Sequence, residues 1–216
     1  MAKTGAASTV AETGSSRSAG TRRLLIEAAI ETLKDVGYTG ASARAIAERA
    51  GSNQGLVFYH FGSVANLLLA ALDAVSADRL RQYGTAVESV GSPAELVDVA
   101  AAIFRQDLDA GYVTVLVEMI AGASSTPGLG TEVAARMGPW FDFAQRAIET
   151  AVADSPVGSV LPAADLAYGV VALYLGLDML SHLQGERDRA LALFSHARQL
   201  AGLLDALNTP TPKEAP

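Results

Sequence analysis

The chain has 216 residues, of which 50% are hydrophobic, and carries a formal net charge of −7. A chain of this size and composition can bury a substantial core, which excludes a disordered protein. It contains no cysteine, which excludes disulfides, thiolate metal sites and a cysteine nucleophile. The three histidines, His60, His182 and His196, fit no metal-ligand spacing, so neither a metal nor another cofactor is expected.

The first 20 residues are small, polar and rich in Gly and Ser. They lack the apolar stretch of a secretion signal, so we expect a flexible tail over 1–20 and a cytoplasmic location. The most apolar run, 166–180, is shorter than a bilayer span needs and contains Asp178, which predicts a buried helix and no membrane partner. Charge is uneven: residues 1–60 hold seven of the 16 basic residues but only five of the 23 acidic ones.

Apolar residues recur at three- and four-residue spacing from Thr21 onward and predict a first helix that ends at Gly37. Ser42 then caps a short second helix that ends at Gly51. Ser52 or Asn53 caps a very short third helix through Tyr59, and Ser63 opens a long fourth helix. Three helices separated by glycine-containing turns therefore precede a long one.

The rest of the chain is also predicted to be helical. No two-residue alternation is sustained, and although residues 112–120 (YVTVLVEMI) are rich in β-branched side chains, an isolated strand would have no partner. Residues 124–130 (SSTPGLG) are expected to be a loop or a helix restart. Helices are predicted over 93–109, 112–123, 129–154, 163–184 and 187–208, followed by a flexible Pro-rich tail over 209–216.

The segment 42–61, SARAIAERAGSNQGLVFYHF, has the composition of a helix-turn-helix. A short helix, a Gly-containing turn and a second short helix are the arrangement that places a recognition helix in the DNA major groove. Its second helix begins with polar side chains that can reach base edges and phosphates. The pattern therefore predicts a double-stranded DNA partner.

Residues 21–68 resemble the N-terminal domain of the TetR family of bacterial transcriptional regulators. The resemblance lies in GYTGAS, ARAIAERAG and the aromatic-aromatic-His-Phe run at 58–61. It implies an all-α fold with a three-helix helix-turn-helix DNA-binding domain over 21–66 and a helical effector-binding and dimerisation domain over 67–208. The family usually shows Ser-Lys after His-Phe, whereas this chain has Ser63-Val64, so one phosphate contact is expected to be missing, with lower affinity and weaker salt dependence.

Family resemblance and position in the motif assign DNA contact to a set of residues. Gln54 can bond adenine through two hydrogen bonds, and Gly55 allows close backbone approach. The alternatives are that Ser52 and Asn53 only cap a helix, that Tyr59 only packs, and that Arg22, like Arg23, is only a solvated charge. Phe58 and Phe61 are expected in the core. The assigned residues are Thr21, Arg22, Ser42, Arg44, Ser52, Asn53, Gln54, Gly55, Tyr59, His60 and Ser63.

The effector site is predicted in the larger domain. Glu118 is a carboxylate in an apolar helix, where it would either bind an effector or pair with an arginine or a helix amide. Asp178 and His182 lie one helical turn apart and fit either a polar pocket wall or a dimer interface. Bulky side chains in this domain can line an apolar cavity. The predicted effector-binding residues are Phe104, Glu118, Met119, Trp140, Phe143, Tyr174 and Asp178.

The last two helices predict a homodimer. The helix at 163–184 is apolar nearly all round, which is unfavourable in water unless another surface covers it. Small residues on it would let a partner helix approach closely, and the family resemblance implies a four-helix interface about a two-fold axis. The predicted interface residues are Gly169, Ala172, Gly176, Phe194, Ala197 and Ala201.

These patterns favour a ligand-responsive DNA-binding regulator over an enzyme. The sequence has no phosphate loop, dinucleotide fingerprint or histidine cluster. We expect a repressor that binds a palindromic operator as a dimer and is released by a small hydrophobic effector. The alternatives are a ligand carrier or protein-interaction module with an impaired DNA-binding head and, on weaker grounds given the acidic larger domain, an architectural DNA binder.

Overall fold

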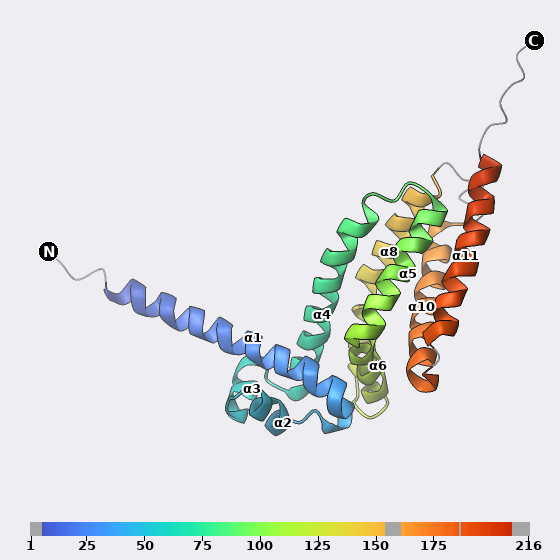
Figure 1. The fold of residues 1–216 in the computed structure, drawn as a ribbon. Helices are drawn as coiled ribbons and strands as arrows, with labels where there is room; N and C mark the ends of the chain where they lie inside the picture. Colours follow the sequence, from blue (N-terminus) through green and yellow to red (C-terminus); the bar gives the residue numbers. More distant parts are fainter. Residues whose placement is uncertain (1–5, 154–160, 186, 209–216) are drawn as a thin grey trace, which may run out of the picture. The chain divides into compact units, whose positions relative to one another are not determined.

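The computed structural model describes residues 6–153, 161–185 and 187–208, and within these ranges it contains helices and no strand (Figure 1). This confirms the all-α prediction, including the helical assignment of 112–120. The tail predicted over 209–216 lies outside the described residues. The helices are α1 (Ala6–Gly40), α2 (Ala43–Arg49), α3 (Gln54–Phe61), α4 (Val64–Val87), α5 (Pro93–Ala110), α6 (Tyr112–Ala123), α7 (Leu129–Ala135), α8 (Gly138–Ala151), α10 (Ala163–Gln184) and α11 (Arg187–Asn208).

Local capping signals set many of the helix ends. The Ser42 hydroxyl accepts the amide of Ala45 at 3.2 Å at the start of α2, and the Ser92 hydroxyl accepts the amide of Glu95 at 3.3 Å at the start of α5. Gly111, with φ of 64°, closes α5 in the left-handed conformation that favours glycine. The predicted bounds of α6, α10 and α11 agree with the structure.

Two predicted boundaries differ from the structure. Helix α1 begins at Ala6, so residues 6–20 extend a helix where a tail was expected, although the described side chains from Ser16 to Ala19 are exposed. The single helix predicted over 129–154 is instead α7 and α8, separated at Arg136 and Met137. Pro139 lacks an N–H group and is tolerated only in the first turn, so the helix restarts there.

The chain forms two compact units, and their division also differs from the one predicted between residues 66 and 67. We call residues 1–76 and 114–133 the head unit, and residues 77–113 and 134–216 the body unit. Helices α4 and α6 each contribute residues to both units. The segment 114–133, far from the N-terminus in sequence, is thus part of the head unit.

The head unit is built on the first four helices. Helix α1 packs against α2, and α2 packs against α3 (Figure 1). The spacing predicted to give α1 a buried face does so, because residues three and four apart lie on the same side of a helix. The buried side chains of these helices include Leu25, Ala29, Leu33, Ile46, Ala47, Val57, Phe61, Leu67 and Leu68.

The end of α1 is attached to α6 through Tyr38. At Gly37 the backbone leaves helical geometry, with φ 69° and ψ −176°, a region that is essentially restricted to glycine. The freed amide of Tyr38 donates to Glu118 Oε2 at 2.8 Å, and the Tyr38 hydroxyl bonds that of Thr126 at 2.9 Å. The Tyr38 ring also lies against Gly122, where any Cβ would overlap it. Glu118 therefore has a structural partner, the backbone amide that the sequence analysis left as the alternative to an effector.

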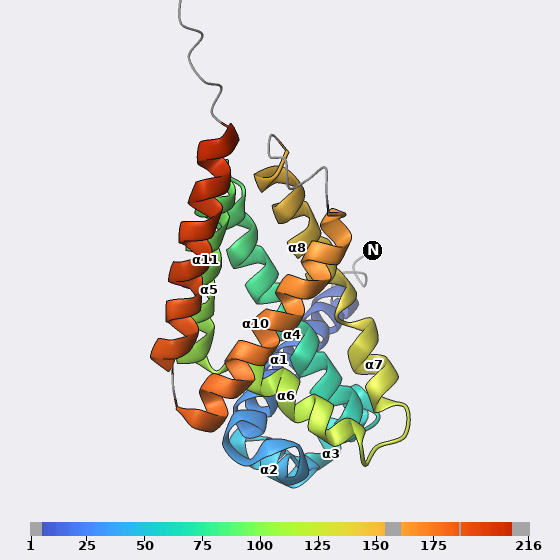
Figure 2. The ribbon, with the colours of Figure 1, turned by 90° about the vertical axis from the view of Figure 1, so that its right-hand side faces the viewer.

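In the body unit, α5 lies along α11 and α8 lies along α10 (Figures 1 and 2). Phe104, Leu108 and Ala190 form a buried cluster, and Tyr174 and Phe194 pack against it. The Phe104 ring centroid lies 5.3 Å from that of Tyr174 and 5.1 Å from that of Phe194. This aromatic core joins α5, α10 and α11.

Helix α10 exposes much of its apolar surface. Among the described helices it is long and apolar enough over Ala163–Leu183 to cross a membrane, while α3 and α4 pass the same test only as a pair bent by 73°. This is weak evidence for a membrane span, because core helices of soluble proteins also pass the test. Its exposed apolar face lies on the body unit and continues onto α11, with Tyr168, Leu173, Leu180, Leu183, Leu193 and Leu200 exposed.

Candidate functional site

Helix α3 presents one buried and one exposed face. Val57 and Phe61, four residues apart, are buried in the head unit. Gln54, Gly55 and Tyr59 are exposed on the same helix, and Tyr59 is 79% exposed. Because α2 and α3 pack together across a turn containing Gly51 at φ 59°, they form a helix-turn-helix whose second helix exposes hydrogen-bonding and aromatic groups.

Three of the residues assigned to DNA contact also cap helices. Ser42 caps α2, the Asn53 side-chain oxygen accepts the amide of Gly55 at 2.8 Å, and the Ser63 hydroxyl accepts the amide of Asn66 at 3.1 Å. A capping hydroxyl accepts through its oxygen and retains a hydrogen to donate, and the Asn53 amide nitrogen retains two. Capping and phosphate binding are therefore compatible for all three.

Two residues of the motif are placed differently from the expectation. The hydroxyl oxygen of Ser52 is buried without a hydrogen-bond partner among the described residues, although the residue as a whole is half-buried. Phe58, expected in the core, is 51% exposed on the same side of α3 as Gln54. The four-residue spacing between these two could have identified Phe58 as a surface residue.

The remaining assigned residues lie around α3. Arg22 is exposed and its guanidinium carbon lies 5.0 Å from the centroid of the Phe61 ring, which places the start of the packed part of α1 beside the end of α3. Thr21 is half-buried and donates its hydroxyl to the Arg17 carbonyl at 3.1 Å. Arg44 is exposed near the start of α2. The half-buried His60 ring packs edge-on against Tyr59, with centroids 4.9 Å apart.

The body unit contains a buried ionic centre that the sequence analysis missed. Asp107 on α5 is fully buried and accepts hydrogen bonds from the Arg79 guanidinium and from the hydroxyls of Tyr83 and Tyr174. Burial raises the pKa of the Tyr174 hydroxyl, which stays protonated and can donate. Phe104, Asp107 and Leu108 share one helical face, so an acid within an apolar stripe was the signal in the sequence.

Aromatic rings surround the guanidinium of Arg79. Its central carbon lies 4.7 Å from the ring centroid of Trp140, 5.5 Å from that of Tyr83 and 5.6 Å from that of Tyr112. All three distances are within the range of cation–π attraction. Arg79 is thus held by a carboxylate and by the faces of three rings.

The predicted effector-binding residues fall into two groups. Glu118 and Met119 belong to the head unit, where Met119 is fully buried. The others belong to the body unit, where the four aromatic ones form two ring contacts, Phe104 with Tyr174, and Trp140 with Phe143 at 6.3 Å between ring centroids. The residues of this second group are Phe104, Trp140, Phe143, Tyr174 and Asp178.

Asp178 adds a second buried acid to the body unit. It is 5% exposed, and burial, opposed by His182, Arg79 and Arg187, raises the pKa of its carboxyl. Ser181, three residues further along α10, is also 5% exposed, and its hydroxyl has no hydrogen-bond partner among the described residues. Tyr174, Asp178 and Ser181 therefore form a polar stripe along α10.

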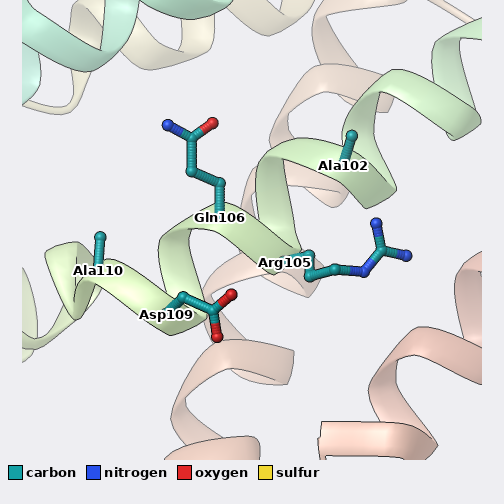
Figure 3. Close-up of a pocket in the computed structure, with 5 residues that line it drawn as sticks. All are labelled: Ala102, Arg105, Gln106, Asp109 and Ala110. Atoms are coloured by element: carbon teal, nitrogen blue, oxygen red, sulfur yellow. The ribbon is translucent and has the colours of Figure 1, made fainter.

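A shallow hollow lies on α5 itself. Figure 3 shows its side chains extending outward from the helix in different directions, from Ala102, Arg105, Gln106, Asp109 and Ala110. Two of its polar groups already have partners, since Asp109 pairs with Arg187 at 2.9 Å and Gln106 donates to Gln82 at 3.3 Å. None of the predicted effector-binding residues lines it, and an open hollow of this kind encloses little of a ligand.

The predicted interface residues are divided between the surface and the core. A Cβ added at Gly169 or Gly176 would meet open space, and Ala172 and Ala197 are exposed. Phe194 instead packs on Phe104, and Ala201 is buried. The face available to a partner is therefore carried by small residues and by the exposed leucines of α10 and α11.

Known proteins resemble the chain in sequence and in fold. Residues 25–71, which run from α1 into α4, match the family described as "Bacterial regulatory proteins, tetR family". An HTH-type transcriptional regulator of Mycobacterium tuberculosis is 32% identical over 100 residues, which are 46% of this chain and 51% of that protein. The match thus spans about half the length of that relative.

Solved structures share the fold of most of the chain. A TetR-family transcriptional regulator from Rhodococcus has a TM-score of 0.69 at 23% identity, covering 85% of this chain and 97% of that one. FadR from Bacillus subtilis, solved in complex with stearoyl-CoA, has a TM-score of 0.68 at 13% identity, covering 83% and 96%. The head unit contains a helix-turn-helix DNA-binding domain. Over residues 25–71 the chain carries the N-terminal domain of the TetR family of bacterial regulatory proteins.

Proposed function

We propose that the protein is a cytoplasmic, ligand-responsive transcriptional repressor rather than an enzyme, and that it binds a palindromic operator as a homodimer. The exposed residues of α3 carry the proposal: Gln54 and Tyr59 are exposed on the second helix of a helix-turn-helix, which Val57 and Phe61 anchor in the core. A helix anchored in this way can enter the major groove without rearranging its core. Arg22 and Arg44 are exposed cations that can bind the flanking phosphates.

The exposed apolar face of α10 and α11 supports the homodimer. Large exposed apolar patches mark interaction surfaces, and a two-fold axis places the same patch on both copies. The small residues Gly169, Ala172 and Gly176 leave open space for a partner helix. Two α3 helices related by this axis would read the two halves of a palindrome.

The body unit is the proposed effector-binding part. The structural likeness to FadR, whose structure holds stearoyl-CoA, supports an effector with an apolar body, and the aromatic core around Phe104 has a matching character. An effector releases DNA only if it binds one conformation more tightly than the other. Effector binding then lowers the affinity of the protein for operator, and operator binding lowers its affinity for the effector by the same factor.

Selection of DNA sequences from a random pool at physiological salt, followed by footprinting, tests the DNA-binding role. A short inverted repeat is the expected result. Gln54→Ala should cost about 1–3 kcal/mol and relax the preference at one base pair of each half-site. Gln106→Ala, which removes an exposed glutamine from the body unit, is the matched control and should bind the operator as the wild type does.

The salt dependence of operator binding gives a second readout. Arg44→Ala should weaken binding to all sequences alike and reduce the slope of log affinity against log salt by about one. Arg81→Ala removes an exposed arginine from the body unit and should leave that slope unchanged. If the wild type binds DNA without sequence preference, the proposal is wrong, and the ligand carrier with an impaired head, suggested by Val64 in place of the family's lysine, takes its place.

A further inference from the structure

The described interior of the body unit holds more negative than positive groups. Its buried charged side chains are Arg79, Asp107 and Asp178, and Ser181 adds a buried hydroxyl without a partner. Arg79 is hydrogen-bonded to Asp107, so Asp178 has no cation of its own inside the unit and interacts only at longer range with Arg79, Arg187 and His182. A buried carboxylate is costly unless it is paired. The interior would be neutral with one more positive charge.

The surroundings of Arg79 already show what this interior recognises. A guanidinium lies between a carboxylate and the faces of Trp140, Tyr83 and Tyr112, and these are the groups that bind guanidinium and quaternary ammonium ions. Trp140, Tyr112 and Tyr174 are half-buried, so part of this aromatic wall is accessible from outside. Phe143, edge-on to Trp140, extends the apolar surface.

We propose that the body unit binds a monovalent organic cation with an apolar body, at the two acids Asp107 and Asp178 and against the ring of Trp140. The bound cation and Arg79 together neutralise both carboxylates, with Arg79 moving from Asp107 towards Asp178. The inference rests on the proposed function, because it names the chemical class of the effector. It excludes fatty acids and other anionic effectors, whose carboxylate would add to the buried negative charge.

The proposed cation site is connected to the DNA-binding helices through α4. Arg79 is a residue of α4, the helix that begins at Val64 immediately after the turn that follows α3. A change in the partners of Arg79 therefore changes how the body unit holds this helix. The expected consequence is a reduced affinity for operator when the cation is bound.

The chain has one tryptophan, and it lies in the proposed site, so its fluorescence is a local reporter. The full-length wild-type protein is titrated with hexylguanidinium and hexyltrimethylammonium, with hexanol as the neutral control and hexanoate as the anionic control. We expect a saturable change in Trp140 emission with the two cations and none with either control. Calorimetry under the same conditions gives the affinity independently.

Two variants separate binding at the acid pair from general effects of charge. Asp178→Asn removes a carboxylate whose burial opposes ionisation, so the variant should fold at least as well as wild type. It should bind the cations about tenfold to a hundredfold more weakly, the loss expected for one charged contact. Asp98→Asn removes an exposed carboxylate from α5 and should bind them as the wild type does.

Several results would overturn the inference. They are saturable binding of hexanoate, no saturable binding of either cation, or equal cation affinities of Asp178→Asn and wild type. Selection of an operator, measured without any cation, tests the regulator by itself. Cation binding without a specific operator would therefore refute the proposed function alone, whereas a specific operator without cation binding would refute this inference alone.

Discussion

Gly37→Ala tests how the end of α1 is held in the head unit. At φ 69° and ψ −176°, a residue with a side chain is strained by about 1–3 kcal/mol. The new Cβ would also lie 2.6 Å from Glu118 Oε2. The flexible Glu118 side chain can move away, but it then loses the Tyr38 amide, a charged hydrogen bond contributing about 1.5–3 kcal/mol. The expected total is a loss of about 2.5–6 kcal/mol in the free energy of unfolding.

Gly51→Ala is the matched control for this substitution. Gly51 also has a positive φ, 59°, but a Cβ there would meet no atom within 4 Å. Its cost should be the backbone strain alone, about 1–2 kcal/mol. Urea unfolding followed by circular dichroism at fixed protein concentration measures both variants, and Trp140 fluorescence follows the body unit separately.

The contact with Glu118 can be isolated by a double-mutant cycle. Glu118→Ala alone should cost about 1.5–3 kcal/mol, whereas in the Gly37→Ala background it should cost almost nothing, since the hydrogen bond is already lost. If Gly37→Ala and Gly51→Ala are equally destabilised, or if the two losses at positions 37 and 118 simply add, the role assigned to Glu118 is refuted.

Three further predictions concern the body unit. Burial raises the pKa of the Asp178 carboxyl above its ordinary value of 3.8, so ionisation of this group destabilises the folded state at neutral pH. Asp178→Asn should therefore have a higher melting temperature than the wild type at pH 7, and the difference should disappear towards pH 4, where the carboxyl is protonated in both states. Arg79→Met leaves the buried Asp107 carboxylate without a cation and should cost about 3–5 kcal/mol in urea unfolding, whereas the double variant with Asp107→Leu should recover much of this loss. Leu183→Glu should convert the proposed dimer to a monomer in sedimentation velocity, an effect that Leu24→Glu in the head unit should not share.

The helices could be predicted from the sequence because the interactions that begin and end them join residues close in sequence. Ser42, Ser92 and Gly111 act within one turn of their own position, and the structure places helix ends at each of them. The break between α7 and α8 also had a local signal, the Gly138-Pro139 pair, which the prediction of one continuous helix overlooked. The buried side of α3 also had a local signal, the four-residue spacing of Val57 and Phe61, which the expectation of a buried Phe58 overlooked.

The buried ionic centre and the two units could not be predicted in this way, because both depend on contacts between distant residues. Asp107 and Tyr174 are 67 positions apart, and Tyr38 and Glu118 are 80 apart. Glu118 illustrates the limit: its sequence environment fitted an effector ligand and a helix-amide partner equally well. Only the position of the Tyr38 amide distinguishes the two roles.

The attachment of Tyr38 to α6 has a consequence for protein engineering. The simplest hybrid regulator joins the DNA-binding part of one protein to the ligand-binding part of another at a single junction. In this chain the Glu118 carboxylate that accepts the hydrogen bond of the Tyr38 amide and the Thr126 hydroxyl that is hydrogen-bonded to the Tyr38 hydroxyl both lie within 114–133. A transplanted recognition module would have to carry that second stretch as well, so grafting needs three junctions in place of one.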